Sequence, residues 1–206
     1  MDYHLLISFS LATATLAISP GPDNIFVLVQ SMAHGKRYGL ATMAGLMTGS
    51  LVHTTLLAFG VSAVINENPA VFYGIKIFGA LYLIYLAVMV FRSDGAIALS
   101  GADQRKKGLG KLYVQGFFMN VLNPKVTLFF LAFFPGFLFS DVLSPVVQFY
   151  TLGAVFILVS SLIFGSIALL SGQIAKYIRH SAHVGQVLKW LQILVFLGIA
   201  LYLLLG

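Results

Sequence analysis

The 206 residues of this chain are 59% hydrophobic and only 9% charged. Water-soluble domains carry about 25% charged residues, so this composition excludes a soluble globular protein and predicts an all-α integral membrane protein. We expect a single transmembrane domain, residues 1–206. The net charge of +6 lies mainly in short loops, where it reports membrane topology rather than binding to nucleic acid. The sequence contains no cysteine, which excludes disulfides and cysteine-ligated metals.

Six apolar stretches approach or exceed the roughly 20 residues that a helix needs to cross a bilayer. They cover residues 4–33, 39–65, 69–91, 113–139, 143–171 and 186–205. The first is interrupted at residues 19–24 (SPGPDN) and the fourth at Asn123-Pro124. A proline inside a helix removes a backbone hydrogen bond and costs about 3 kcal/mol or more. We therefore expect six transmembrane helices, with the first and fourth broken.

The charges of the loops predict the orientation of these helices. Basic residues gather in the first, third and fifth loops, whereas the second and fourth carry one acidic residue each, Glu67 and Asp141. The basic set comprises His34, Lys36, Arg37, Arg92, Arg105, Lys106, Lys107, Lys111, Lys176, Arg179, His180 and His183. By the positive-inside rule, loops one, three and five are cytoplasmic and both termini lie outside.

This topology makes the two halves of the chain run in opposite directions. Residues 1–95 and 113–206 would form the halves, joined by a cytoplasmic loop at about 92–112. Each half breaks its first helix at proline, after ~22 Å and ~20 Å of helix from opposite membrane faces. The pattern predicts a 3+3 inverted repeat, an architecture that places the transport site near the bilayer midplane.

Each break also carries one charge, Asp23 or Lys125. A charge at the bilayer centre costs roughly 2.5–3.5 kcal/mol on insertion scales, and such residues usually mark a functional site. Lys125 would bind a carboxylate, helped by backbone N–H groups after Pro124, and Asp23, with unwound carbonyls near Gly21, would bind an ammonium group. A zwitterionic amino acid suits such a site. Alternatively, the two charges only hold the broken helices together.

Three asparagines accompany the charges, namely Asn24, Asn120 and Asn123. Their amides can satisfy the backbone groups that the prolines leave unpaired, or they can bind a ligand. The predicted substrate-binding set is Gly21, Pro22, Asp23, Asn24, Asn120, Asn123, Pro124 and Lys125.

In the second span, Ala41, Gly45, Gly49 and His53 recur every four residues and share one helix face. Small residues at this spacing allow close helix packing, so His53 should face the bundle interior. Because imidazole titrates near neutral pH, His53 suits proton exchange. We predict proton coupling through either Asp23, the charge at the first break, or His53. The alternative for His53 is a hydrogen bond within the packing.

The third span contributes two accessory candidates, Lys76 and Tyr82. Lys76 could instead extend along its helix to the outer surface, and Tyr82 could simply pack.

Several blocks of the sequence resemble the lysine-exporter/homoserine–threonine-exporter (LysE/RhtB) family of bacterial amino-acid translocators. The matching blocks are SPGPDNIFVLVQSMAHGKRYGL (19–40), GLMTGSLVHTTLLAFGVSAV (45–64), KIFGALYLIYLA (76–87) and QGFFMNVLNPKVTLFFLAFFPGF (115–137). The resemblance implies a six-helix inner-membrane exporter driven by the proton-motive force. The family's motif positions here are Pro20, Gly21, Pro22, Asp23, Asn24, Gly45, Gly49, His53, Lys76, Gly79, Tyr82, Asn120, Asn123, Pro124 and Lys125.

Together, these features predict a secondary active transporter that exports amino acids or related metabolites by proton-coupled alternating access. Its expected partners are the amino acid, protons and membrane lipid, with no cofactor, metal or nucleic acid. The Gly45–Gly49 face leaves homo-oligomerisation open. The alternatives are export of an inorganic cation or another small solute, or a membrane scaffold or enzyme. The chain contains no GxSxG, HExxH, P-loop or GxGxxG sequence, which argues against an enzyme.

Overall fold

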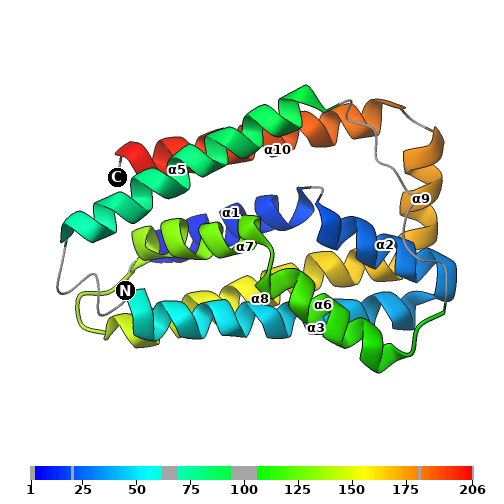
Figure 1. The fold of residues 1–206 in the computed structure, drawn as a ribbon, viewed down its shortest axis with the longest axis horizontal. Helices are drawn as coiled ribbons and strands as arrows, with labels where there is room; N and C mark the ends of the chain where they lie inside the picture. Colours follow the sequence, from blue (N-terminus) through cyan, green and yellow to red (C-terminus); the bar gives the residue numbers. More distant parts are fainter. Residues whose placement is uncertain (1–2, 20, 62–68, 94–105, 181, 206) are drawn as a thin grey trace.

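The computed structural model describes residues 3–19, 21–61, 69–93, 106–180 and 182–205, and within these ranges all regular structure is helical (Figure 1). The α-helices are α1 (Tyr3–Ile18), α2 (Pro22–His34), α3 (Lys36–Leu56), α5 (Pro69–Arg92), α6 (Leu109–Val121), α7 (Pro124–Leu128), α8 (Pro145–Leu169), α9 (Ser171–His180) and α10 (Ala182–Leu205). Two π-helical turns, η1 (Leu57–Val61) and η2 (Phe129–Phe133), and one 3₁₀ turn, η3 (Phe134–Phe137), complete the described structure.

The long helices run nearly parallel or antiparallel to one another, and α1 begins at the same end of the molecule where α10 ends (Figure 1). Counted over the described residues, three helices are long and apolar enough to cross a membrane, or five if each bent pair forms one crossing. The predicted span 69–91 coincides with α5, a helix of 24 residues. Large apolar side chains such as Leu11, Leu162 and Leu194 are exposed on the outside of the bundle, where lipid would cover them. The protein is therefore a multi-pass membrane protein.

Both predicted helix breaks are present. α1 and α2 meet at 60°, and α6 meets the segment Pro124–Phe137 at 49°. Pro22 and Pro124 each occupy the first position of the new helix. A proline is tolerated there because the N–H that it lacks would have no intrahelical acceptor. Pro20, which belongs to the first predicted break, lies outside the described residues.

α3 packs very closely against α6, which carries the second break. A Cβ atom on Gly45 would overlap the carbonyl of Tyr113, and one on Gly116 would overlap the carbonyl of Thr42. Only glycine allows the two backbones to approach this far. Gly45, Gly49 and His53 are all buried, as the spacing of the small residues predicts.

α5 and α10 lie side by side along one edge of the bundle (Figure 1). They contact the remaining helices mainly through η2, α9, α1 and α7. η2 and η3 belong to a core of phenyl rings, in which Phe9 of α1 is completely buried and its ring centre lies 4.9 Å from that of Phe134. This core lies in the interior of the bundle, between the breaks and the end where α1 begins.

The predicted fifth loop, between residues 171 and 186, is in fact partly helical because it contains α9. The helix is amphipathic: Ile174 and Ala175 point inward against α2 and α8, while Lys176 and Tyr177 are exposed. A helix of ten residues with a polar face is too short and too polar to be predicted as a membrane span, so the sequence predicts a loop here. The predictions for Glu67, Arg105 and the rest of residues 62–68 and 94–105 fall outside the described residues.

Candidate functional site

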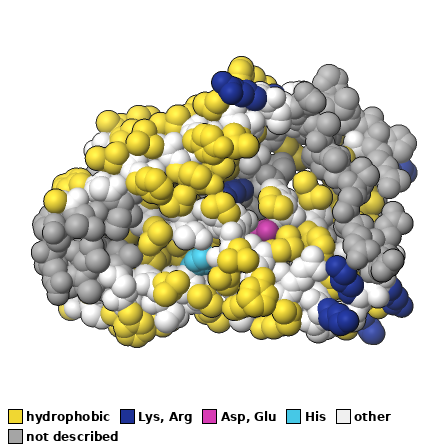
Figure 2. All heavy atoms as spheres, in the orientation of Figure 1, with side chains coloured by type: hydrophobic (Ala, Val, Ile, Leu, Met, Phe, Trp, Pro, Cys, Tyr) yellow, Lys and Arg dark blue, Asp and Glu magenta, His cyan; other side chains and the backbone are white. Residues whose placement is uncertain are grey.

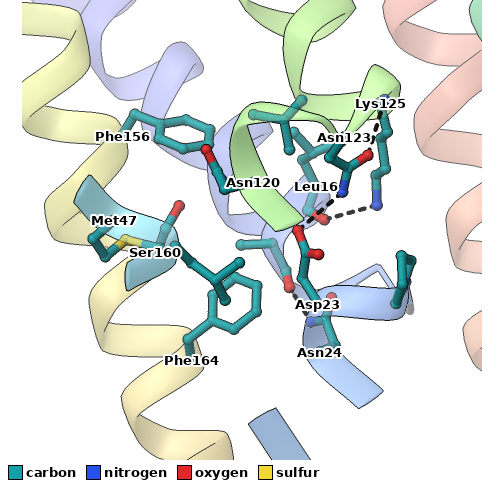
Figure 3. A pocket seen from close by; sticks show the side chains of 15 residues that line it. Leu16, Asp23, Asn24, Met47, Asn120, Asn123, Lys125, Phe156, Ser160 and Phe164 are labelled. Carbon is teal, nitrogen blue, oxygen red and sulfur yellow. Dashed lines mark hydrogen bonds between the residues drawn. The ribbon is translucent and has the colours of Figure 1, made fainter. Parts of the chain in front are cut away.

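The two helix breaks meet in the middle of the bundle, and Asn123 joins them (Figure 3). Its Nδ2 donates a hydrogen bond of 2.9 Å to Oδ2 of Asp23, and its Oδ1 accepts one of 3.0 Å from the backbone N–H of Lys125. The second bond caps the N-terminus of α7. The backbone N–H of Lys125 is one of the groups after Pro124 that were expected to help bind a carboxylate. It is already hydrogen-bonded to Asn123.

Lys125 contacts the other half of the chain without bonding the carboxylate of Asp23. Its Nζ makes long hydrogen bonds to the carbonyls of Leu16 (3.5 Å) and Ser19 (3.4 Å), the last turn and the end of α1. The same nitrogen lies 5.3 Å from the centre of the Phe196 ring of α10. A cation at the C-terminal end of a helix is favourable because the unpaired carbonyls there carry partial negative charge. The two charges are therefore linked through Asn123 rather than by a direct ion pair.

The other two predicted asparagines serve the broken backbone. Asn24 donates from Nδ2 to the carbonyl of Ala17 at 2.6 Å, across the first break. The carbonyl of Asn120 accepts from the backbone N–H of Asn123 and lies 3.2 Å from Nε2 of His53. A carbonyl only accepts, so Nε2 is the protonated nitrogen of this imidazole when the ring is neutral. The side chains of Asn24 and Asn120 both face the cavity described next.

A small cavity of about 40 Å³ lies beside the breaks, lined by residues of α1, α2, α3, α6, α7 and α8 (Figure 3). Asp23 and Ser160 stand across this cavity from one another. Asp23 Oδ1 and Ser160 Oγ are both buried and have no hydrogen-bond partner among the described residues. An unpaired buried polar atom costs about 1–3 kcal/mol, so both atoms are positioned for a ligand or water. Ser160 was not among the residues predicted from the sequence, because hydroxyl residues are common in apolar helices.

A large cavity of about 620 Å³ lies on the other side of the breaks, between α2, α7, α5 and α10. It extends from Gly21 and Lys125 to Ser93 and Lys189, at the end of α5 and in the first turns of α10. Much of its wall is apolar, and the predicted accessory residue Tyr82 lines it. Gly21, Pro22, Asn123 and Lys125 line both cavities, whereas Asp23 lines only the small one.

The structure does not bring His53 and Lys76 into the lining of either cavity. His53 stacks near Phe130, with ring centres 5.3 Å apart, and supports the second break from α3. Lys76 is only 8% exposed, and its Nζ lies 5.9 Å from the centre of the Tyr73 ring, so its side chain does not extend into solvent.

The surface charges follow the pattern read from the loops. Figure 2 shows Lys and Arg side chains gathered at the end of the molecule where α2 ends and α3 and α6 begin. The same view shows acidic, basic and histidine side chains close together near the centre of this face, among hydrophobic groups.

Comparisons with known proteins point to one family. A sequence profile of the LysE type translocators matches residues 14–206. The homoserine/homoserine lactone efflux protein of Salmonella typhimurium is 31% identical over 179 residues, which cover 87% of this chain and 86% of that protein. The leucine efflux protein of Klebsiella pneumoniae is 27% identical over 200 residues, covering 94% and 92%. An uncharacterized membrane protein of Vibrio cholerae is 26% identical over 179 residues, covering 87% and 86%. No solved structure gives a significant match.

Proposed function

The chain belongs to the LysE type translocator family, and from this membership we propose that it exports amino acids from the cytoplasm by alternating access. The observation that carries the proposal is the meeting of two broken helices at Asp23, Asn123 and Lys125, between a small and a large cavity. Irregular backbone and charge at membrane depth persist where they line a cavity that binds a solute.

Lys125 is the proposed binding residue for the carboxylate of the amino acid. It lines the large cavity, and its present partners are two main-chain carbonyls at long distances, which a carboxylate would outcompete. The side chain of the substrate would lie against the apolar part of the cavity, which includes Tyr82, Leu86 and Phe196. Lys189 places a second positive charge on the same wall, which disfavours basic side chains, and the apolar remainder of the wall favours uncharged ones, so we propose substrates with uncharged side chains.

Asp23 is the proposed partner of the amino group and also the first candidate for proton coupling. A carboxylate that holds either a proton or an ammonium group, but not both at once, couples the export of one to the import of the other. His53 remains the second candidate proton carrier. Its bond to the carbonyl of Asn120 would transmit a change of charge directly to the second break.

The proposed topology has six transmembrane spans in a 3+3 inverted repeat, with both termini outside and loops one, three and five in the cytoplasm. Two features support it. The bent pair α1–α2 runs opposite to the bent pair α6–α7 (Figure 1). The next long helix of each half packs on the broken helix of the other, α3 on α6 and α8 on α1 and α2. Under this topology the large cavity opens toward the cytoplasm, where an exporter takes up its substrate.

The test is efflux from vesicles preloaded with a panel of labelled amino acids that includes homoserine and leucine, at defined pH gradients. We expect wild type to export at least one neutral member of the panel. Asp23→Asn should abolish gradient-driven export, because the amide binds neither an ammonium group nor a proton as the carboxylate does. The matched control is Asp141→Asn, which changes an exposed acidic residue of the α7–α8 connection and should leave export unchanged.

Two outcomes would contradict the proposal. The first is the absence of export for every amino acid tested, with export of an inorganic cation or another solute instead. The second is full gradient-driven export by Asp23→Asn, which would reduce Asp23 to a link between the broken helices.

A further inference from the structure

Two oxygen atoms in the small cavity have no partner among the described residues, and they come from different halves of the chain. Asp23 Oδ1 belongs to α2 and Ser160 Oγ to α8. Asp23 is 6% exposed and Ser160 is 1% exposed, so neither oxygen is satisfied by bulk solvent. A carboxylate oxygen and a hydroxyl oxygen without donors are suited to a group that supplies positive charge or protons.

The size of the small cavity limits what these oxygens can bind. At about 40 Å³ it accommodates roughly three or four water molecules, each of which needs about 10–15 Å³. A whole amino acid, even the smallest, does not fit. The amino acid fits the large cavity of about 620 Å³, and Asp23 does not line that cavity. The two charges at the breaks therefore share the small cavity, and of the two only Lys125 also lines the large one.

We propose that the small cavity is the binding site of the coupling cation, a hydrated proton or Na⁺, held by Asp23 Oδ1 and Ser160 Oγ. This inference rests on the proposed amino-acid export and adds Ser160 as a residue of the coupling machinery. The cation occupies Asp23 when no substrate is bound. When the amino group of the substrate reaches the same carboxylate, it displaces the cation, and this competition is what makes export an exchange.

The surroundings of Asp23 contain few other groups that could take this role. Lys125 lines the small cavity from α7, and its positive charge favours a charged Asp23. His53 on α3 bonds the backbone of Asn120 outside the lining. α3, α6 and α8 line the cavity with uncharged residues only, among the described residues, including Met47, Asn120 and Phe164. Asp23 is thus the one acidic residue described there.

The test uses the purified full chain in vesicles and compares two kinds of transport. Exchange of labelled for unlabelled leucine or homoserine, with no ion gradient, needs no coupling cation. Accumulation against a concentration gradient needs it and is driven either by a pH gradient without Na⁺ or by a Na⁺ gradient at equal pH. These two arms identify the cation. We expect Ser160→Ala to lower gradient-driven accumulation roughly tenfold, as for the loss of one hydrogen bond to a charged group, and to keep exchange within about twofold.

A stability measurement separates this role from a structural one. Ser160 Oγ has no partner in the part of the chain that the structure describes, so Ser160→Ala should leave the melting temperature unchanged or slightly raised. The matched control is Thr13→Val, which removes another buried hydroxyl that has no partner among residues with a described position, on α1 and outside the lining of both cavities. It should change neither exchange nor accumulation.

The outcomes are distinguishable. If wild type exchanges neither amino acid nor any other member of the panel, the proposed export itself fails. If wild type exchanges and accumulates but Ser160→Ala behaves like wild type, the cation site is wrong and the export stands. The site is also wrong if neither gradient drives accumulation, or if Ser160→Ala lowers the melting temperature and reduces exchange and accumulation equally.

Discussion

The two helix breaks differ in how the backbone groups that they leave unpaired find hydrogen-bond partners. At the second break the repair is local: Asn123 caps α7 with its own side chain, and its backbone N–H bonds the carbonyl of Asn120. At the first break, Gly21 occupies the N-cap position before α2 and has no side chain that could cap the helix. The exposed carbonyls of α1 are bonded from a distance, by Asn24 seven residues later and by Lys125 from the other half of the chain.

This difference indicates that the first break is the one that moves. Apart from the bond of Asn123 to Asp23, the second break keeps its hydrogen bonds whatever the first does, because their partners are its own residues or His53 of the tightly packed α3. The first depends on Lys125, and its bonds to that lysine are long. A carboxylate that attracts Lys125 would therefore loosen the end of α1. Substrate binding at the second break would be transmitted in this way to the first.

The largest expected effect comes from Lys125→Met, which keeps the apolar stem and removes the charge. Export and exchange should both fall on the order of 100-fold, because the substrate carboxylate loses its cation. Leaving the α1 carbonyls without a donor should also cost about 1 kcal/mol of stability, the low end of the range because the bonds are long. Vesicle exchange and thermal unfolding in detergent measure the two effects.

The chain offers a matched control in Lys189→Met. Lys189 also donates to the carbonyl at a helix end, Ser93 O at 2.6 Å, and its Nζ also lies near a phenyl ring, Phe91 at 5.6 Å. It lines the large cavity in the first turns of α10 rather than at a break. We expect a similar loss of stability with at most a severalfold loss of exchange. Equal losses of exchange for both variants would show that Lys125 acts only as a helix cap.

The second prediction concerns Gly21, where both cavities meet. Its backbone (φ −156°, ψ 174°) is open to any residue, and a Cβ atom there would lie 3.7 Å from Asn24 Oδ1 and 3.8 Å from Lys125 Nζ. Gly21→Ala should therefore fold with unchanged or slightly higher stability. The methyl group would stand between the cavities and reduce exchange about 5- to 10-fold.

Gly45→Ala, in the close contact between α3 and α6, should give the opposite result. Its Cβ would overlap the carbonyl of Tyr113, so we expect a large loss of stability and little folded protein to assay. If Gly21→Ala unfolds in the same way, or if it exchanges as fast as wild type, the space beside Gly21 is not the passage between the cavities.

The sequence predicted the breaks because their cause is local: proline and a charge in an apolar run have few explanations. It predicted the close packing of α3 for the same reason, since glycine at every fourth position allows it. The link through Asn123 was not predictable, because a sequence does not say whether an amide pairs with Asp23, the backbone or a ligand. Ser160 was not predictable either. Its role depends on an oxygen being left without a partner, which only the packing of α8 against α2 decides.

The smallest expected effect concerns His53 and tests whether the second break only holds its residues in place or also takes part in coupling. His53 Nε2 contacts the carbonyl of Asn120, and the amide of a glutamine can donate to the same atom. We expect His53→Gln to lower exchange less than about threefold and to keep the pH dependence of export, whereas His53→Ala should lower stability because the carbonyl loses a partner. The measurement is export across a series of pH values for both variants. If glutamine preserves stability but removes the pH dependence, then His53 itself carries the proton, and the second break takes part in coupling rather than only holding Asn123 and Lys125 in place.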